Sequence, residues 1–281
     1  MKNIGVIPNW DKENIAPLVD RVCEFLKEEH VNVNILPREK ADDVKQIYRN
    51  ITSWLPEVEM IIVIGGDGTI LRVARETAQW KLPLLGINAG HKGFLAEIEE
   101  ANLLHSLRML IEGNFSVHER MILNTAVTRE NRRVAEFLAV NDVVLSRGPF
   151  SRIIDVETCI NGDYLETYSG DGLIVATSTG STAYSLSAGG PIVSPSLEVF
   201  VITPICPHSL YNRSVIVDAS ENISIEILSS YSEIVLTIDG QLGFNLKKND
   251  IVEVSRSPEC ARLISFPGSS FYRLLHDKLK G

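Results

Sequence analysis

The sequence predicts an α/β domain with a parallel, Rossmann-like sheet, followed by a β-rich domain and a C-terminal helix. Over residues 1–114, short apolar runs alternate with segments of helical periodicity, as in a doubly wound fold. Over residues 115–255, short segments alternate apolar and polar residues and are separated by turn residues. Apolar residues at helical spacing return near residue 271, so we expect the tail, from about 256 to 281, to pack back on the first domain.

The first domain is predicted to alternate strands with helices along its length. Short apolar or alternating runs predict strands at residues 4–7, 31–36, 60–64 and 84–87. Helical patterns follow at residues 15–26, 41–54, 70–78 and 102–112, of which the second is mostly polar. Because strands that alternate with helices lie parallel, ligands are expected beyond the carboxyl ends of these strands.

The second domain is predicted to be built from hairpins. Asn161-Gly162 is a strong signal for a two-residue turn between extended segments. Residues 223–227 and 251–254 alternate apolar and polar side chains, which is typical of strands with one buried face. Residues 173–176 are wholly apolar and predict a buried strand, after which a polar stretch leads to a short helix.

Composition restricts the class of protein. The 281 residues carry a formal net charge of −9, which argues against a nucleic-acid binder, because such proteins present a basic stripe to the phosphates. No apolar run approaches membrane-spanning length and no apolar leader opens the chain, so we expect a soluble, cytoplasmic protein without a membrane partner. The four cysteines lie far apart and have neither zinc spacing nor the density of a disulfide framework.

The strand at residues 60–64 runs directly into Gly65-Gly66-Asp67-Gly68-Thr69 and then into a helical pattern. A glycine turn at a helix N-terminus binds phosphate, because the first amides point outward and no Cβ atoms block the approach. Asp67 is unexpected there, since a carboxylate repels phosphate unless it holds a metal or takes a proton. The alternative is a tight turn in which Asp67 caps the helix.

A second distinctive stretch, at residues 169–191, contains glycines and hydroxyl side chains in unusual density. Small residues and hydroxyls allow a ligand's ribose and amide groups to approach closely. The alternative is a polar loop in which Ser and Thr act only as turn formers.

These two stretches together resemble the NAD kinase family. Agreement in order extends to Asn141-Asp142, to residues 86–88 and 94–97, to residues 204–210 and to Asp239-Gly240-Gln241, and covers residues 60–241. The glycine-aspartate turn alone is weakly specific, whereas the Thr/Ser/Gly stretch with Asn-Asp upstream is strongly specific. The sequence departs from the family pattern at Ser169, where some members have Arg, at Ser178, where many have Pro, and at residues 212–214.

The resemblance implies transfer of the γ-phosphate of ATP, or of polyphosphate, to the 2′-hydroxyl of the adenosine ribose of NAD. It implies a divalent metal ion, expected to be Mg²⁺, but no set of protein ligands for it. It also implies a homodimer or homotetramer, and it agrees with an α/β domain of residues 1–114 that binds phosphate and a β-rich domain of residues 115–255 that binds NAD.

The resemblance assigns roles to matched positions. Asp67 is expected to be catalytic, as a general base or as a group that orients the hydroxyl. The phosphates of ATP are expected at Gly65, Gly66, Gly68 and Thr69. The residues expected to bind NAD are Asp67, Gly68, Arg72, Asn141, Asp142, Arg152, Asp171, Thr182, Ala183, Tyr184, Ser185, Leu186, Ser187 and Gln241.

Two other functions stay open at this point. Lipid kinases of the diacylglycerol or sphingosine type share the Gly-Gly-Asp-Gly-Thr turn, and a silent sensor would bind NAD(P) without turnover. Sequence also leaves open ATP against polyphosphate, NAD against NADH, dimer against tetramer, inhibition by NADP(H), and whether Asp67 is a base or an orienting group.

Overall fold

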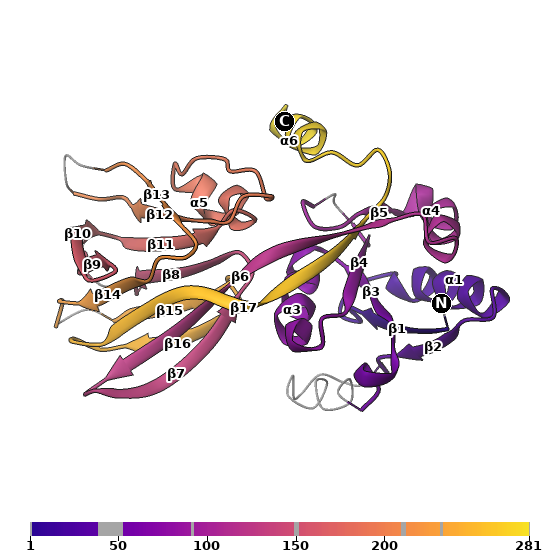
Figure 1. Ribbon diagram of the computed structural model, residues 1–281, viewed down its shortest axis with the longest axis horizontal. Helices are drawn as coiled ribbons and strands as arrows, with labels where there is room; N and C mark the ends of the chain where they lie inside the picture. Colours follow the sequence, from indigo (N-terminus) through magenta and orange to yellow (C-terminus); the bar gives the residue numbers. More distant parts are fainter. Residues whose placement is uncertain are drawn as a thin grey trace. The chain divides into compact units, whose positions relative to one another are not determined.

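The computed structural model describes residues 2–38, 53–90, 93–148, 152–208, 212–230 and 233–280 (Figure 1). The chain divides into two compact units. The α/β unit comprises Met1–Glu119 and Ala261–Gly281, and the β unit comprises Arg120–Cys260. The helix predicted at residues 41–54 lies, except for its last two residues, outside the described part of the chain.

The sheet of the α/β unit is parallel, as predicted. Its main strands are β1 (Asn3–Pro8), β2 (Asn32–Ile35), β3 (Met60–Gly65) and β4 (Pro83–Asn88). They lie in the order β4-β3-β1-β2, and β5 (Ile98–Glu99) pairs in parallel with β4 (Figure 1). Every residue of β3 is buried, because this strand lies inside the sheet and is covered on both faces.

The longer helices of the α/β unit are α1 (Ile15–Glu28), α3 (Asp67–Thr77), α4 (Leu103–Ile111) and α6 (Phe271–Leu279). Short 3₁₀ turns are η1 (Leu55–Glu57), η2 (Ala78–Trp80) and η3 (Glu100–Asn102). The first three helices each bury one apolar face, as their periodicity predicts. No residue of α6 is buried, and its contact with the rest of the unit includes Lys278, whose Nζ lies 5.7 Å from the ring centre of Phe94.

Strand β17 (Ile251–Ser265) is longer than the four residues predicted for it. Its first residues pair antiparallel with β14 (Ile223–Ile227), and Arg262 and Leu263 pair in parallel with β4. The sequence hides this extension because Pro258, which cannot donate to a ladder, interrupts the apolar pattern. In the structure Pro258 is exposed, while Ser257 takes the buried position beside it.

The β unit consists of two antiparallel sheets around one core. One sheet has the order β13-β12-β11-β8-β15-β16 and the other contains β10-β9-β14-β17, with β6 beside β17 and β7 beside β6 (Figure 1). The strands not yet given bounds are β6 (Ser116–Arg129), β7 (Arg132–Ala139), β8 (Asp142–Arg147), β9 (Ile154–Ile160), β10 (Asp163–Gly170), β11 (Gly172–Thr177), β12 (Val199–Ile205), β13 (Val215–Asp218), β15 (Ile234–Ile238) and β16 (Leu242–Leu246). Alternate residues of both sheets fill the core.

The turn predicted at Asn161-Gly162 joins β9 to β10. Both residues have positive φ, 52° and 88°, as a two-residue hairpin turn of this kind requires. The predicted hairpin is therefore confirmed, and with it the β-rich class of this unit.

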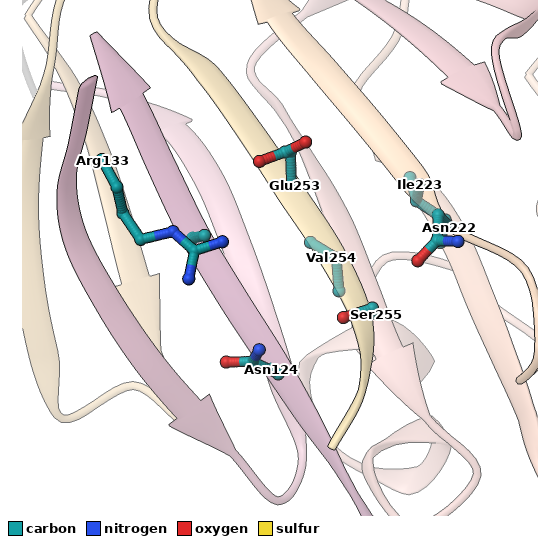
Figure 2. A pocket seen from close by; sticks show the side chains of 8 residues that line it. Asn124, Arg133, Asn222, Ile223, Glu253, Val254 and Ser255 are labelled. Atoms are coloured by element: carbon teal, nitrogen blue, oxygen red, sulfur yellow. The ribbon is translucent and has the colours of Figure 1, made fainter. Parts of the chain in front are cut away.

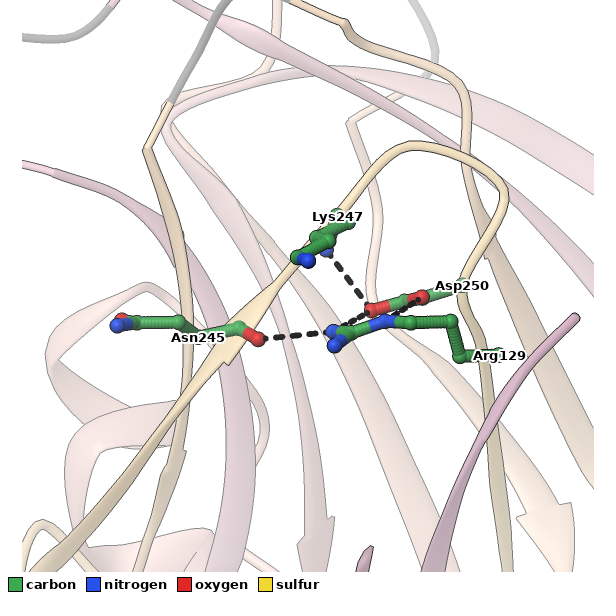
Figure 3. A network of polar contacts seen from close by, with 4 residues as sticks. All are labelled: Arg129, Asn245, Lys247 and Asp250. Atoms are coloured by element: carbon green, nitrogen blue, oxygen red, sulfur yellow. Dashed lines mark hydrogen bonds and ion pairs between the residues drawn. The ribbon is translucent and has the colours of Figure 1, made fainter. Parts of the chain in front are cut away.

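A buried ion pair ties the end of β6 to the turn before β17 (Figure 3). The carboxylate of Asp250 is fully buried and accepts from Nε and Nη2 of Arg129 at 2.7 and 2.6 Å and from the N–H of Lys247 at 2.8 Å. Nη2 of Arg129 also donates to the carbonyl of Asn245 at 3.1 Å. Because both charges are satisfied, this pair holds three segments of the β unit together.

A hollow of about 210 Å³ lies over strands of the second sheet of the β unit (Figure 2). Its lining includes Asn124, Arg133, Asn222 and Glu253, and no residue predicted to bind ATP or NAD lines it. Among the described residues, no helix has the length and apolar character needed to cross a membrane.

Candidate active site

The glycine turn after β3 shapes the start of α3. Gly66 is the N-cap residue, Asp67 is the first helical residue, and no side chain of the described residues caps the helix. The alternative in which Asp67 caps α3 is therefore wrong. A Cβ at Gly65 would lie 2.6 Å from Oγ1 of Thr69, so the close approach of Thr69, in the first turn of α3, requires glycine at position 65. The first turn of α3 thus keeps the properties of an anion site.

Thr69 is tied into the turn by both of its polar groups. Its N–H donates to the carbonyl of Gly66 at 2.9 Å, and its hydroxyl accepts from Nδ2 of Asn9 at 3.0 Å. Thr69 therefore shapes the turn. Asn9 is absent from the predicted site residues, because it follows β1 in a loop that carries no motif.

Asp67 reaches across to the segment that follows β4. Its Oδ2 accepts from the N–H of Phe94 at 2.6 Å, and its Oδ1 accepts from the N–H groups of Leu95 and Ala96 at 3.2 and 3.3 Å. A carboxylate has about four acceptor positions, two on each oxygen. Three backbone donors thus fix the orientation of Asp67 and leave one acceptor position, on Oδ2.

Gly93 provides a test of how strictly Asp67 is positioned. A Cβ at Gly93 would overlap the carboxylate of Asp67, so alanine there must displace it. Because a displacement of about 1 Å at a reacting group can cost about 10²-fold in rate, we expect Gly93→Ala to lower turnover by about that factor. The control is Gly243→Ala, where a Cβ would meet, among the residues that the structure describes, only Cγ1 of Val235 at 3.7 Å. Turnover is measured at saturating substrates, and equal rates for the two variants would contradict the expectation.

Two cationic side chains of the α/β unit lie near the glycine turn after β3. Arg72 follows the turn in the sequence, and Lys12 approaches it from the loop after β1. Arg72, predicted to contact pyrophosphate, lies partly buried on α3, and its Nε has no hydrogen-bond partner among the described residues. Lys12, which the sequence did not single out, donates from Nζ to the carbonyl of Ala89 at 2.9 Å. No periodicity or motif marks Lys12, since it lies in the loop after β1.

In the β unit, Asn141 and Asp142 are held by the turn between β15 and β16. The carboxylate of Asp239 accepts from the backbone N–H groups of Val140, Asn141 and Asp142 at 3.1, 2.7 and 3.3 Å. The N–H of Thr177, the last residue of β11, donates to the carbonyl of Asn141 at 2.8 Å. These contacts bring the start of β8, the end of β11 and the β15–β16 turn to one end of the sheet.

Asp142 lies in an environment that disfavours its charge. Burial and, to a smaller extent, the carboxylate of Asp239 raise the pKa of Asp142 to about 7, while the N–H of Tyr184 lowers it. Only 4% of Asp142 is exposed. Near neutral pH the Asp142 side chain therefore exchanges between a carboxylate, which only accepts hydrogen bonds, and a carboxylic acid, which can also donate one.

This pKa implies a pH dependence of stability. The unfolded chain loses the proton of Asp142 near its ordinary pKa of 3.8, and the folded chain retains it to about pH 7. Between these two pKa values the folded chain binds one proton more than the unfolded chain. Raising the pH through this window removes that proton from the folded chain, so the free energy of unfolding should fall by a few kcal/mol. Asp142→Asn should remove this contribution. Denaturant titrations of both proteins from pH 5 to 8 test it, and parallel curves would count against it.

Many hydroxyls in the stretch after β11 serve the structure. The hydroxyls of Thr177 and Ser181 donate to the carbonyls of Val140 and Ser178, both at 2.7 Å, and Oγ of Ser185 lies 3.0 Å from Oγ1 of Thr203. The alternative in which Ser and Thr only shape the loop therefore explains the buried hydroxyls of Thr177, Ser181 and Ser185. The short elements η4 (Gly180–Thr182) and α5 (Tyr184–Ser187) leave other predicted residues accessible, namely Thr182, Ala183, Tyr184, Leu186 and Ser187.

Asp171 lies at the other end of β11 from Asn141 and Asp142. Asp171 precedes the first residue of β11, whereas Asp142 pairs with Ala176, five residues further along. At about 3.3 Å per residue, Asp171 and Asp142 are therefore roughly 17 Å apart along the strand. Nε of Arg147 donates to Asp171 at 2.5 Å. Arg147, which is absent from the predicted site residues and belongs to no motif, brings a guanidinium to Asp171.

The three remaining predicted residues are exposed. Gly68 lies in the first turn of α3, Arg152 precedes β9, and Gln241 lies in the same turn as Asp239. Of the motif at residues 204–210, the last two residues lie outside the described part of the chain. The described structure thus forms two clusters, one around Asp67 in the α/β unit and one around Asp142 in the β unit.

Profiles of two domain families match the chain. The ATP-NAD kinase N-terminal domain matches residues 4–115, and the ATP-NAD kinase C-terminal domain matches residues 140–266. This chain belongs to the NAD kinase family. Membership of the NAD kinase family excludes the lipid-kinase alternative and confirms the resemblance seen in the sequence.

Curated NAD kinases are similar to the chain over its whole length. The NAD kinase of Natranaerobius thermophilus is 48% identical, with 100% of this chain and 99% of the relative covered. The NAD kinase of Caldanaerobacter subterraneus subsp. tengcongensis is 41% identical, with 99% of each covered. The sequence thus matches these NAD kinases over nearly all of their length.

Solved structures share the fold. An NAD kinase from Archaeoglobus fulgidus in complex with ATP superposes with a TM-score of 0.76 at 26% identity, over 99% of this chain and 98% of that one. Yeast NADH kinase complexed with NADH superposes with a TM-score of 0.85 at 24% identity, over 100% and 88%. The predicted fold class, a parallel α/β unit followed by a β-rich unit and a C-terminal helix, is that of NAD kinases.

Proposed function

We propose that the chain transfers the γ-phosphoryl group of ATP to the 2′-hydroxyl of the adenosine ribose of NAD, forming NADP and ADP. The observation that carries this proposal is the position of Asp67, a carboxylate fixed by three backbone N–H groups at the start of α3. A phosphate site alone requires no carboxylate. A hydroxyl that attacks a phosphorus atom loses its proton, and a carboxylate beside it can accept that proton or orient the oxygen.

In the proposed reaction the phosphates of ATP lie against Gly65, Gly66 and the first turn of α3. The 2′-hydroxyl donates to the remaining acceptor position on Oδ2 of Asp67. The new bond joins the 2′-oxygen to the γ-phosphorus, and the bond from that phosphorus to the bridging oxygen of ADP breaks. As a base, Asp67 removes the hydroxyl proton; as an orienting group, it aligns the oxygen, which suffices in a loose transition state.

A divalent metal ion, with Mg²⁺ as the expected ion, fits this site as a companion of ATP. Among the described residues there is no group of three His, Cys, Asp or Glu side chains that could hold a metal. Mg²⁺ in kinases is bound by substrate phosphates, water and few protein oxygens. Oδ1 of Asn88, at the end of β4, is buried, has no hydrogen-bond partner among the described residues, and suits such a contact. When bound, the ion would neutralise charge on the transferred phosphoryl group.

NAD is proposed to bind along the β unit. Asn141 and Asp142 would hydrogen-bond the adenosine, since their backbone is held rigid by Asp239 and Asp142 can accept or donate. Together with Gln241, the accessible residues of the segment after β11 would line the rest of the dinucleotide, namely Thr182, Ala183, Tyr184, Leu186 and Ser187. The separation of Asp171 from Asp142 suits opposite ends of an extended dinucleotide, with the nicotinamide near Asp171. Arg72 and Arg152 are proposed for the pyrophosphate.

The assembly is proposed to be a homodimer or homotetramer in the cytoplasm, where ATP and NAD are both available. Light scattering at several protein concentrations measures the number of copies, and a monomer throughout would overturn this part of the proposal.

The test of the reaction is formation of NADP from NAD, ATP and Mg²⁺, followed by an NADP-specific dehydrogenase. Parallel reactions replace ATP with polyphosphate, NAD with NADH, and Mg²⁺ with EDTA, and one includes added NADP to measure inhibition. Formation of NADP with ATP supports the proposal. NAD binding without product from either donor would overturn it in favour of a silent NAD(P) sensor.

A further inference from the structure

Lys12 lies over the glycine turn of the α/β unit. Its Nζ donates to the carbonyl of Ala89 at 2.9 Å, just beyond the end of β4. A Cβ built on Gly66 would lie 3.4 Å from the same Nζ, and one built on Gly90 would lie 3.3 Å from it. The ammonium group therefore lies against the two glycines that follow β3 and β4.

The loop that carries Lys12 is held in place without its side chain. The N–H of Asn9 donates to the carbonyl of Ile64 at 2.8 Å, and the N–H of Lys12 donates to the carbonyl of Asn9 at 3.1 Å. Nδ2 of Asn9 adds the bond to Oγ1 of Thr69. Because these bonds already dock the loop on the turn, the ammonium group is available for a ligand.

The charge of Lys12 is not neutralised in the described part of the chain, where no carboxylate forms an ion pair with it. The carboxylate of Asp67 is directed to the N–H groups of residues 94–96 instead. An ammonium group has three N–H donors, and within the described ranges only one of them is used, in the bond to the carbonyl of Ala89. In a protein of net charge −9, a partly buried cation with two remaining donors beside a glycine turn is suited to a phosphate.

We propose that Lys12 binds a phosphate group of the phosphoryl donor. The proposal rests on the proposed function, which puts ATP at Gly65 and Gly66. In this role Lys12 acts as a fixed point charge, which raises the affinity for the donor and leaves that for NAD unchanged.

The experiment compares Lys12→Met with Lys27→Met, which removes an exposed charge from the last turn of α1. Calorimetry measures Kd for the non-hydrolysable β,γ-imido analogue of ATP with Mg²⁺ and, separately, Kd for NAD. Loss of a charge-assisted hydrogen bond is expected to raise Kd for the ATP analogue by about tenfold or more in Lys12→Met. Kd for NAD should stay within about twofold in both variants, and Lys12→Arg should restore most of the affinity for the analogue.

Three results would overturn the proposal. The first is an unchanged Kd for the ATP analogue in Lys12→Met, which would leave the side chain only its bond to Ala89. The second is a larger effect on NAD than on the analogue, which would place Lys12 at the dinucleotide phosphates. The third is an equal rise of Kd for the ATP analogue in Lys27→Met, which would show that net charge, and not a contact made by Lys12, sets this affinity. The comparison of Kd values decides the role of Lys12 even if the wild type forms no NADP, a result that would count only against the proposed reaction.

Discussion

Asp67→Asn should lower kcat for NADP formation by about 10²–10⁴-fold while Kd for NAD changes by no more than a few-fold. The substitution keeps the size of the side chain and removes its ability to accept a proton. It also replaces one acceptor oxygen with an N–H donor, so at least one of the backbone N–H groups of residues 94–96 faces another donor. Single-turnover kinetics with saturating ATP, together with equilibrium binding of NAD, separate these effects.

The comparison with Gly93→Ala sharpens this result, because that variant moves the carboxylate and keeps its chemistry. A much larger loss in Asp67→Asn than in Gly93→Ala would identify Asp67 as a base. Equal losses in the two would identify an orienting group, for which position is what matters. A kcat within tenfold of the wild type in Asp67→Asn would remove Asp67 from the chemical step, and a parallel loss of NAD affinity would assign it a structural role.

Asp250→Ala should be among the most destabilising single substitutions in the β unit. The Asp250 side chain is fully buried, and Arg129, which retains 25% exposure, would lose both of its charged contacts (Figure 3). Breaking a buried pair by removing one partner costs about 3–5 kcal/mol, and the partial exposure of Arg129 places the expected cost near about 3 kcal/mol. For a unit of this size that corresponds to a fall in Tm of about 6–12 °C.

Glu198→Ala is the matched control for Asp250→Ala. Glu198 also pairs with an arginine at 2.6 Å, but it is 54% exposed and its partner Arg256 is 48% exposed. Solvent screens that pair, so its loss should cost less than about 1 kcal/mol. Thermal and denaturant unfolding of both variants gives the comparison, and similar shifts in the two would show that burial of Asp250 is not what stabilises the turn.

Local pattern was enough to predict most of the fold. The apolar run before Gly65, the periodicity of α1 and the Asn161-Gly162 turn are each determined by neighbours in the chain. The extension of β17 to Ser265 was not predictable in this way. Its last pairs depend on β4, which lies far away in the sequence, and Pro258 breaks the local pattern.

The candidate site was predictable where a residue type signals its chemistry, as Asp67 and Asn141-Asp142 do. The contacts that position these residues were not predictable, although Asp239 itself stands in a motif that resembles the family. Asp239 acts on the backbone of residues 140–142, about a hundred positions earlier in the chain. Lys12 and Arg147 belong to no motif, and only the folded chain brings them to the glycine turn and to Asp171. Side-chain identity therefore predicts what a site does better than what holds it together.

The three N–H groups that hold Asp67 belong to the main chain, and this has a consequence for how the sequence can vary. Phe94, Leu95 and Ala96 contribute to the carboxylate through groups that every residue except proline possesses. Their side chains are thus free to serve other contacts and to be replaced without changing the support of Asp67. Gly93 has no such freedom, because any side chain would occupy the volume of the carboxylate. The most restricted position around the proposed catalytic group is therefore one that has no side chain.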